Sequence, residues 1–286
     1  MTQVREHYDT TSLTFDPFTR HPFYTEVNRA LVERTLDVLE DTHPAGEVLC
    51  LVELASGTGA VTELILDGLT RRQRQAVVVG MDPSPDAVEH ARHRLAGRPV
   101  SFIVGDVTDL GQAPVKADAA FFCNAIHLVA DKERCVAALA EALVVGGVLA
   151  CNTTFYEGAY VAGSESFYFA LTRQSIGWLR AHHPEERVAH RGKVTARQWN
   201  SAEEYRALVG GHGLEVTYLE EVPVQFPLRA IQDIGRYALF IEGALPGVAL
   251  PIGAEALSAA AATAFADLHL EFVPRNWLQL IARRTA

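Results

Sequence analysis

The sequence is poor in the features that place a protein in a membrane or in an oxidising compartment. Its 286 residues contain four cysteines, Cys50, Cys123, Cys135 and Cys151, and none of them forms a Cys-x-x-Cys pair. Isolated cysteines in apolar segments are typical of small buried hydrophobes rather than of disulfides or zinc ligands. No apolar stretch reaches the length of a membrane span, and residues 1–7 lack the apolar segment of a secretion signal. We therefore expect a soluble, cytoplasmic protein without membrane contact.

Positive charge is also scarce. The chain carries 25 lysines and arginines against 35 acidic residues, which gives a formal net charge of −10. This balance argues against a surface that binds nucleic acid. The densest basic run, residues 71–74, follows a predicted helix, where cations offset the helix dipole. The expected partner is a small-molecule substrate, and a homodimer is compatible with the sequence.

Apolar residues, in contrast, make up 49% of the chain, enough for a core in one large α/β domain with insertions. Between residues 47 and 154, short apolar runs alternate with helical patterns, which predicts a parallel sheet with helices on both faces. The predicted strands are 48–54, 76–81, 100–104, 117–123 and 147–153, and the predicted helices are 60–71, 84–96 and 131–143. The predicted segments are an N-terminal helical cap (1–45), a core (46–154), a helical lid (155–200) and the C-terminal part of the sheet (201–286) with a helical insertion (227–272).

The most informative segment follows the first predicted strand. Residues 52–59 read Val-Glu-Leu-Ala-Ser-Gly-Thr-Gly, and the second strand ends near Asp82. The two glycines let the backbone turn sharply and approach a ligand closely, and Asp82 can accept hydrogen bonds from two vicinal ribose hydroxyls. A dinucleotide site would have a third glycine where Thr62 stands. Glu53, before the loop, instead suits a cofactor with a cationic centre and an α-amino group.

This pattern resembles the first motif of the class I S-adenosylmethionine-dependent methyltransferases, which reads Glu-x-Ala-x-Gly-x-Gly. The resemblance covers about 47–154 well and 201–286 loosely. It implies a Rossmann-like α/β fold with a seven-stranded, mostly parallel sheet, helices on both faces, a helical lid and an antiparallel last strand. It also implies that S-adenosylmethionine is the cofactor, held by Tyr24, Glu53, Ala55, Ser56, Gly57, Gly59, Asp82, Pro83, Gly105, Asp106, Val107, Cys123 and Asn124.

Two later segments extend the resemblance. The third predicted strand runs into Gly-Asp-Val, where Asp106 would accept a hydrogen bond from the adenine amino group and Val107 would pack on the ring. An aspartate at a strand end also caps its own backbone, which is the structural alternative. After the fourth strand, Cys123 and Asn124 would line the methionine end of the cofactor.

Two histidines are the candidates for catalysis, and two N-terminal tyrosines are candidates for binding. The resemblance puts His127 just beyond the methyl group, where an imidazole could take a proton from a hydroxyl. A structural residue bonded to the backbone is the alternative reading. In the family the N-terminal segment folds over the cofactor, which makes His21 the second candidate base. It also makes Tyr24 a candidate for the methionine carboxylate and Tyr8 one for the substrate.

The segment 155–200 is rich in aromatic residues and lacks strand-like alternation. Large planar side chains can build an apolar pocket wall, and Phe155, Tyr168 and Trp178 are the substrate-binding candidates. The alternative is an ordinary satellite core beneath helices. His182 and His183 lie in a charged, proline-broken run that fits no standard ligand set, so we predict no metal.

The sequence therefore predicts an enzyme that transfers a methyl group from S-adenosylmethionine to a small hydrophobic or aromatic metabolite, in secondary-metabolite biosynthesis. Methylation of O or C is favoured over N. Two alternatives stay open. One is a cyclase or pericyclase that uses the cofactor structurally, and the other is a catalytically silent methyltransferase-like subunit, because fold alone does not decide function.

Overall fold

The structure is a computed structural model that describes residues 13–107, 110, 116–189 and 199–285. The chain divides into two compact units, and each is assembled from separate segments. One, which we call the core unit, contains residues 22–160, 197–224 and 275–286, and the other, the helical unit, contains 1–21, 161–196 and 225–274. The long helix that follows residue 21 belongs to the same unit as the sheet.

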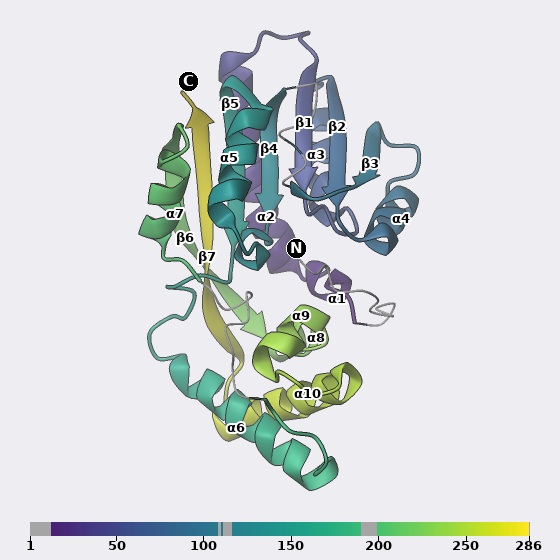
Figure 1. Cartoon of the computed structure of the whole chain (residues 1–286), viewed down its shortest axis with the longest axis vertical. Coiled ribbons are helices and arrows are strands. Elements are labelled where there is room, and N and C mark those ends of the chain that lie inside the picture. Colours follow the sequence, from purple (N-terminus) through teal and green to yellow (C-terminus); the bar gives the residue numbers. More distant parts are fainter. Residues whose placement is uncertain (1–12, 108–109, 111–115, 190–198, 286) are drawn as a thin grey trace. The chain divides into compact units, whose positions relative to one another are not determined.

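A seven-stranded sheet organises the core unit (Figure 1). Its strands are β1 (Leu49–Leu54), β2 (Ala76–Asp82), β3 (Val100–Val104), β4 (Ala117–Cys123), β5 (Leu143–Thr153), β6 (Leu214–Pro227) and β7 (Phe272–Arg284). The strand order is β3-β2-β1-β4-β5-β7-β6. The first five strands pair in parallel, and β7 pairs antiparallel with β5. This confirms the predicted fold, including the reversed last strand.

Helices cover both faces of this sheet. They are α2 (Pro22–Thr42), α3 (Ala60–Arg71), α4 (Pro85–Arg94), α5 (Lys132–Ala142) and α7 (Ala202–Gly210), with a short 3-10 helix η2 (Ile126–Leu128) after β4. In Figure 1, α5 lies in front of the central strands and α2 lies behind them. Sequence signals fix several helix starts. Ser84 caps α4 by accepting a hydrogen bond from the amide of Ala87 at 3.3 Å, and Ser201 and Glu204 form a capping box on α7.

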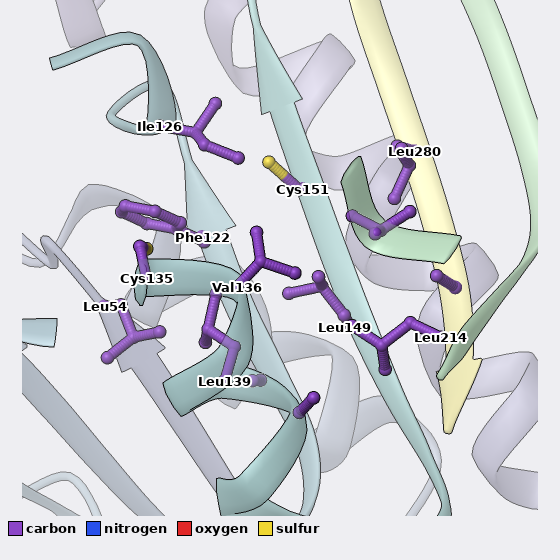
Figure 2. Close-up of a cluster of buried hydrophobic side chains, with 14 of the residues drawn as sticks. Leu54, Phe122, Ile126, Cys135, Val136, Leu139, Leu149, Cys151, Leu214 and Leu280 are labelled. Atoms are coloured by element: carbon purple, nitrogen blue, oxygen red, sulfur yellow. The ribbon is translucent and has the colours of Figure 1, made fainter. Parts of the chain in front are cut away.

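Apolar side chains from the sheet and from the helices in front of it meet in one buried cluster (Figure 2). Val136 and Leu139 of α5 face Phe122 of β4 and Leu149 of β5, and all four are at most 2% exposed. Three of the cysteines, Cys123, Cys135 and Cys151, are buried and free, as expected for small hydrophobes. This core therefore fixes the positions of the strands whose carboxyl ends carry the polar residues described below.

The helical unit contains α1 (Asp16–Thr19), α6 (Glu165–His182), α8 (Leu228–Ile234), α9 (Ala238–Ala244) and α10 (Leu250–Asp267). The alanine-rich α10 packs against α6, α8 and α9, because small side chains let helices approach closely. Phe167 of α6 and Phe265 of α10 meet edge to face, with ring centroids 5.4 Å apart. Within the described residues, no helix is both long and apolar enough to cross a bilayer.

Candidate active site

The loop between β1 and α3 is bent by residues with left-handed backbone angles. Ala55, Gly57 and Gly59 have φ values of 50°, 53° and 81°. A Cβ at Gly59 would lie 3.2 Å from Leu95, so this glycine allows the loop and α4 to pack closely. A Cβ at Gly57 would meet nothing within 4 Å. The backbone at Gly57 therefore presents an uncovered surface that a ligand can approach.

Asp82, the last residue of β2, holds this loop in place. Its Oδ2 accepts a hydrogen bond from the amide of Gly57 at 2.8 Å, and its Oδ1 accepts one from the amide of Ser84 at 2.9 Å. Burial raises the pKa of the Asp82 carboxyl, and the two amide donors partly offset that rise. Each carboxylate oxygen keeps a second lone pair, so the same side chain can also accept hydrogen bonds from a diol.

Glu53 lies on β1 beneath the loop and is 2% exposed. Its carboxylate accepts a hydrogen bond from the Thr62 hydroxyl on α3. Burial raises the pKa of Glu53 to about 8, and the nearby Asp82 carboxylate adds to the rise while Thr62 opposes it. The ligand-free side chain is therefore mainly protonated at neutral pH. A cation bound nearby would restore its charge, which fits a cofactor that carries a sulfonium and an ammonium group.

A network of buried amides fixes Asn124, directly after β4. Asn124 adopts φ of 57°, a conformation that asparagine tolerates better than most residues. Its amide donates to the main-chain oxygen and to Oδ1 of Asn152, at 2.9 and 3.1 Å. Its Nδ2 lies 3.3 Å from Oδ1 of Asn28, which also accepts from Asn152 Nδ2 at 2.9 Å. Helix α2 and strands β4 and β5 are thereby locked together at one edge of the sheet.

Tyr24 completes this network from α2. Its main-chain oxygen accepts a hydrogen bond from Asn28 at 2.7 Å, and its hydroxyl lies 3.5 Å from Asn124 Nδ2. Burial raises the pKa of the Tyr24 hydroxyl well above its ordinary value, so it stays protonated. Two buried polar atoms at this edge, Asn124 Oδ1 and Ser56 Oγ, have no hydrogen-bond partner in the described part of the chain. Such atoms favour a polar ligand at this edge.

The predicted adenine-binding segment also lies at this edge. Gly105 follows β3, and its amide donates to the main-chain oxygen of Asp82 at 3.1 Å. Asp106 and Pro83 are exposed, while Val107 is half-buried. Cys123 ends β4 and is buried. The structure thus brings the predicted cofactor residues to the carboxyl ends of β1, β2, β3 and β4, where open α/β sheets bind ligands.

His127 lies in η2 and is 5% exposed. Its Nδ1 is 3.0 Å from Oγ1 of Thr153, and its ring packs against Phe155 with centroids 4.5 Å apart. Burial, together with the positive charges of Lys132 and Arg275, lowers the pKa of His127 to about 3. This environment favours the uncharged imidazole, and the role of His127 as a base stays a prediction.

The other candidates lie in the helical unit or outside the described residues. His21 Nε2 is 3.0 Å from Oδ2 of Asp233, which is buried. Tyr168 meets Phe167 edge to face at 5.3 Å, and Trp178 stacks on His182 at 4.5 Å. Both aromatic residues are half-buried. Tyr8 lies outside the described residues.

Sequence reasoning missed the residues that position the candidates. These are Asn28, Thr62, Asn152, Thr153 and Asp233. One signal was available for two of them, because Asn152 and Thr153 end an otherwise apolar strand. Polar residues in a buried strand need partners, and that requirement points to a polar site at the strand end.

Residues 51–147 match the family model described as Methyltransferase domain. This range runs from within β1 into β5 and includes the loop-and-acid arrangement of Glu53, Gly57, Gly59 and Asp82. The part of the chain that holds the glycine loop and both acids is therefore similar to methyltransferase domains.

Among curated proteins, the chain is similar to trans-aconitate 2-methyltransferase from Methylobacterium nodulans. The two are 33% identical over 120 residues, which cover 39% of this chain and 44% of the relative. The match thus spans less than half the length of the curated relative.

Two solved structures illustrate the shared fold. A protein from Galdieria sulphuraria, provisionally named a sarcosine dimethylglycine methyltransferase, matches with a TM-score of 0.55 and 12% identity over 92% of this chain and 86% of its own. The 4+2 cyclase SpnF matches with a TM-score of 0.53 and 16% identity over 91% of this chain and 81% of its own. At these identities the likeness concerns the fold alone.

Proposed function

We propose that the protein transfers a methyl group from S-adenosylmethionine to oxygen or carbon of a small organic acceptor. The observation that carries the proposal is the polar edge of the sheet. There a glycine loop with an open surface, a diol-accepting carboxylate and a buried glutamic acid lie at adjacent strand ends. A small hydrophobic or aromatic metabolite is the acceptor class that the aromatic residues around 155–200 favour.

The residues at this edge fit the parts of the cofactor. Asp82 would hold the ribose, Asp106 and Val107 the adenine, and Glu53, Tyr24 and Asn124 the methionine end. The unpartnered atoms of Ser56 and Asn124 offer further hydrogen bonds. When bound, S-adenosylmethionine supplies an electrophilic methyl group. The chain's own contribution is then alignment and exclusion of water, which can account for much of the acceleration of such a transfer.

If the acceptor must lose a proton, His21, the second candidate base from the sequence, is the residue that we propose to test. Its Nε2 faces the buried Asp233 carboxylate, and Asp233 also accepts from Arg229 Nε at 3.2 Å. A carboxylate that orients an imidazole is the arrangement that activates many catalytic histidines. Replacing His21 with alanine should then lower turnover of hydroxyl acceptors 10²- to 10⁴-fold and leave cofactor affinity nearly intact.

The test is direct. The full chain is incubated with S-adenosylmethionine and a panel of carboxylic acids, phenols, β-dicarbonyl compounds and amines, and S-adenosylhomocysteine and methylated product are measured. Product that scales with S-adenosylhomocysteine supports the proposal. Tight cofactor binding without S-adenosylhomocysteine for any acceptor, but with conversion of a polyene to a cyclised isomer, would favour the cyclase alternative instead.

Binding of the cofactor also separates the enzyme from a silent subunit. A methyltransferase-like subunit that has lost its ligand would give no calorimetric signal with S-adenosylhomocysteine. Substitutions at Tyr168 or Trp178 should weaken acceptor binding more than cofactor binding, since neither residue belongs to the unit that contains the proposed cofactor residues. Unchanged acceptor affinity in both variants would remove these residues from the proposed pocket.

A further inference from the structure

In the core unit, His127 is hydrogen-bonded to Thr153, which is in turn hydrogen-bonded to Phe155. The Phe155 amide lies 3.0 Å from Thr153 Oγ1, and the same oxygen lies 3.0 Å from His127 Nδ1. Thr153 ends β5 and is 1% exposed. Strand β5 lies beside β4, and β4 lies beside β1. These three residues therefore lie at the same sheet edge as the Glu53 loop.

Counting hydrogens decides how the imidazole is protonated. The Phe155 amide can only donate, so the Thr153 oxygen is an acceptor there. The hydroxyl has one hydrogen of its own, and the acceptor that the structure places beside it is His127 Nδ1. If Nδ1 carried the ring proton instead, the buried hydroxyl hydrogen would lose this acceptor, which is costly. The neutral ring therefore carries its proton on Nε2.

The surroundings oppose a second proton on this ring. Lys132 and Arg275 both act on His127 electrostatically, and a cationic imidazole would be a third positive charge in a largely buried place. Phe155 covers the ring at 4.5 Å. In the described part of the chain, no hydrogen-bond partner faces Nε2. An N–H with these properties is suited to donate to a ligand rather than to remove a proton from one.

We propose that Thr153 is a positioning residue that holds His127 as a neutral imidazole with an Nε2–H, and that this N–H donates a hydrogen bond to an oxygen of the methyl acceptor. The inference rests on the proposed methyl transfer and sharpens it. Carboxylates, enolates and phenolates have oxygen lone pairs for this donor, and their negative charge suits the two nearby cations. A neutral amine uses its lone pair in the attack and has none left for His127.

Two substitutions of His127 separate a donor from a base. Glutamine can donate through its side-chain amide but cannot take up a proton, whereas alanine can do neither. We expect His127→Ala to lower kcat for carboxylate, enolate or phenolate acceptors about 100-fold and His127→Gln to stay within about tenfold of wild type. Calorimetry should show S-adenosylhomocysteine affinity within about twofold in both. Equal losses in the two variants would overturn the donor role, as would faster turnover of amines than of the oxygen acceptors.

Thr153 is tested without turnover by nuclear magnetic resonance of the full chain labelled with ¹⁵N-histidine, the His127 signals being assigned from their loss in His127→Ala. We expect an unprotonated Nδ1 and a protonated Nε2 that do not change between pH 5.5 and 8.5. Thr153→Ser should keep this pattern, and Thr153→Val should lose it and lower kcat on oxygen acceptors about tenfold. A protonated Nδ1, or a titration near pH 6.5, would overturn the assignment. If wild type methylates nothing while the pattern holds, the proposed reaction fails and the tautomer assignment stands.

Discussion

The two units of the chain use their buried polar residues differently. In the core unit, Asn28 pairs with Asn124 and Asn152 across 96 and 124 positions of sequence and joins a helix to two strands. In the helical unit, buried hydroxyls return to their own helix or turn. Ser175, for example, donates to the carbonyl of Leu171 at 2.8 Å. Local hydrogen bonds of this kind stabilise a single helix, whereas hydrogen bonds between distant segments fix how those segments lie relative to one another. The comparison identifies the core unit as the place where a site is held rigid.

Asp233 is the member of the helical unit that departs from this pattern. It is 4% exposed and pairs with His21 across 212 positions of sequence. By the same reasoning, this pair is the part of the helical unit with the strongest claim to a role in chemistry.

The largest effect should come from the aromatic packing of the helical unit. Phe167 is 1% exposed and packs on Phe265, so Phe167→Ala should lower the free energy of unfolding by about 3–5 kcal/mol. Denaturant titration measures this. Phe169 is 72% exposed on the same helix, and Phe169→Ala is the matched control, with an expected change below about 0.5 kcal/mol. Similar effects for the two variants would contradict the assignment of Phe167 to a satellite core.

The next effect concerns the cofactor. Asp82→Ala should weaken S-adenosylmethionine binding by about 1.5–3 kcal/mol, the scale of losing hydrogen bonds to a charged group. Calorimetry on the folded variant measures this. Asp86→Ala is the control, because Asp86 is an exposed acid at the start of the next helix. An unchanged affinity in a folded Asp82→Ala variant would remove the nucleoside assignment.

The comparison itself is tested by truncating one polar residue in each unit. Asn152→Ala should cost about 1–3 kcal/mol of unfolding free energy, because it removes the Oδ1 that accepts from the Asn124 amide and the Nδ2 that donates to Asn28 Oδ1. Ser175→Ala should cost less than about 1 kcal/mol, since the Leu171 carbonyl can still accept the helix hydrogen bond. Chemical denaturation of both variants measures the difference. A Ser175→Ala variant that is the more destabilised of the two would reverse the distinction.

The sequence predicted those parts of the molecule whose signals are local. The first four strands fall within about two residues of the predicted ranges, since apolar runs and turn residues mark them. Strand β5 begins at Leu143 rather than near 147, because Gly146 and Gly147 hid its first half. Strand β7 begins at Phe272 and includes Pro274 and Arg275, which are atypical of a strand.

The same distinction applies to the candidate site residues, some of which are marked by the local sequence and some of which are not. Glu53, Gly57, Gly59 and Asp82 carry a pattern that is readable within thirty residues of sequence. Asn28, Thr153 and Asp233 could not be assigned, because each acquires its role from a partner that only the fold brings near. The protonation state proposed for His127 depends on Thr153, Phe155, Lys132 and Arg275 together, and no pattern in the sequence records that combination.

The last predicted effect is a pH dependence of cofactor binding that Glu53 should cause. Its carboxyl is protonated in the ligand-free chain up to a pKa of about 8, and a cationic ligand favours the ionised form. Binding should therefore release a proton, so affinity for S-adenosylmethionine should rise with pH from 6 to 8, by at most about tenfold per unit, and then level off. Calorimetry in buffers of different ionisation enthalpy counts the released proton.

The stability of the ligand-free chain should change with pH in the opposite direction from the cofactor affinity. A folded-state pKa above the unfolded value of about 4.3 means that the folded chain holds a proton that the unfolded chain lacks, so stability falls as pH rises through this window. His127, with its lowered pKa, acts in the reverse direction, but only below about pH 6.5. The range from pH 6.5 to 8 thus isolates Glu53 from His127.

In Glu53→Gln, the fall in stability and the proton release should both disappear, while the cofactor's own amino group titrates as before and cancels in the comparison. A variant that keeps the wild-type pH profile would show that Glu53 is not the linked group.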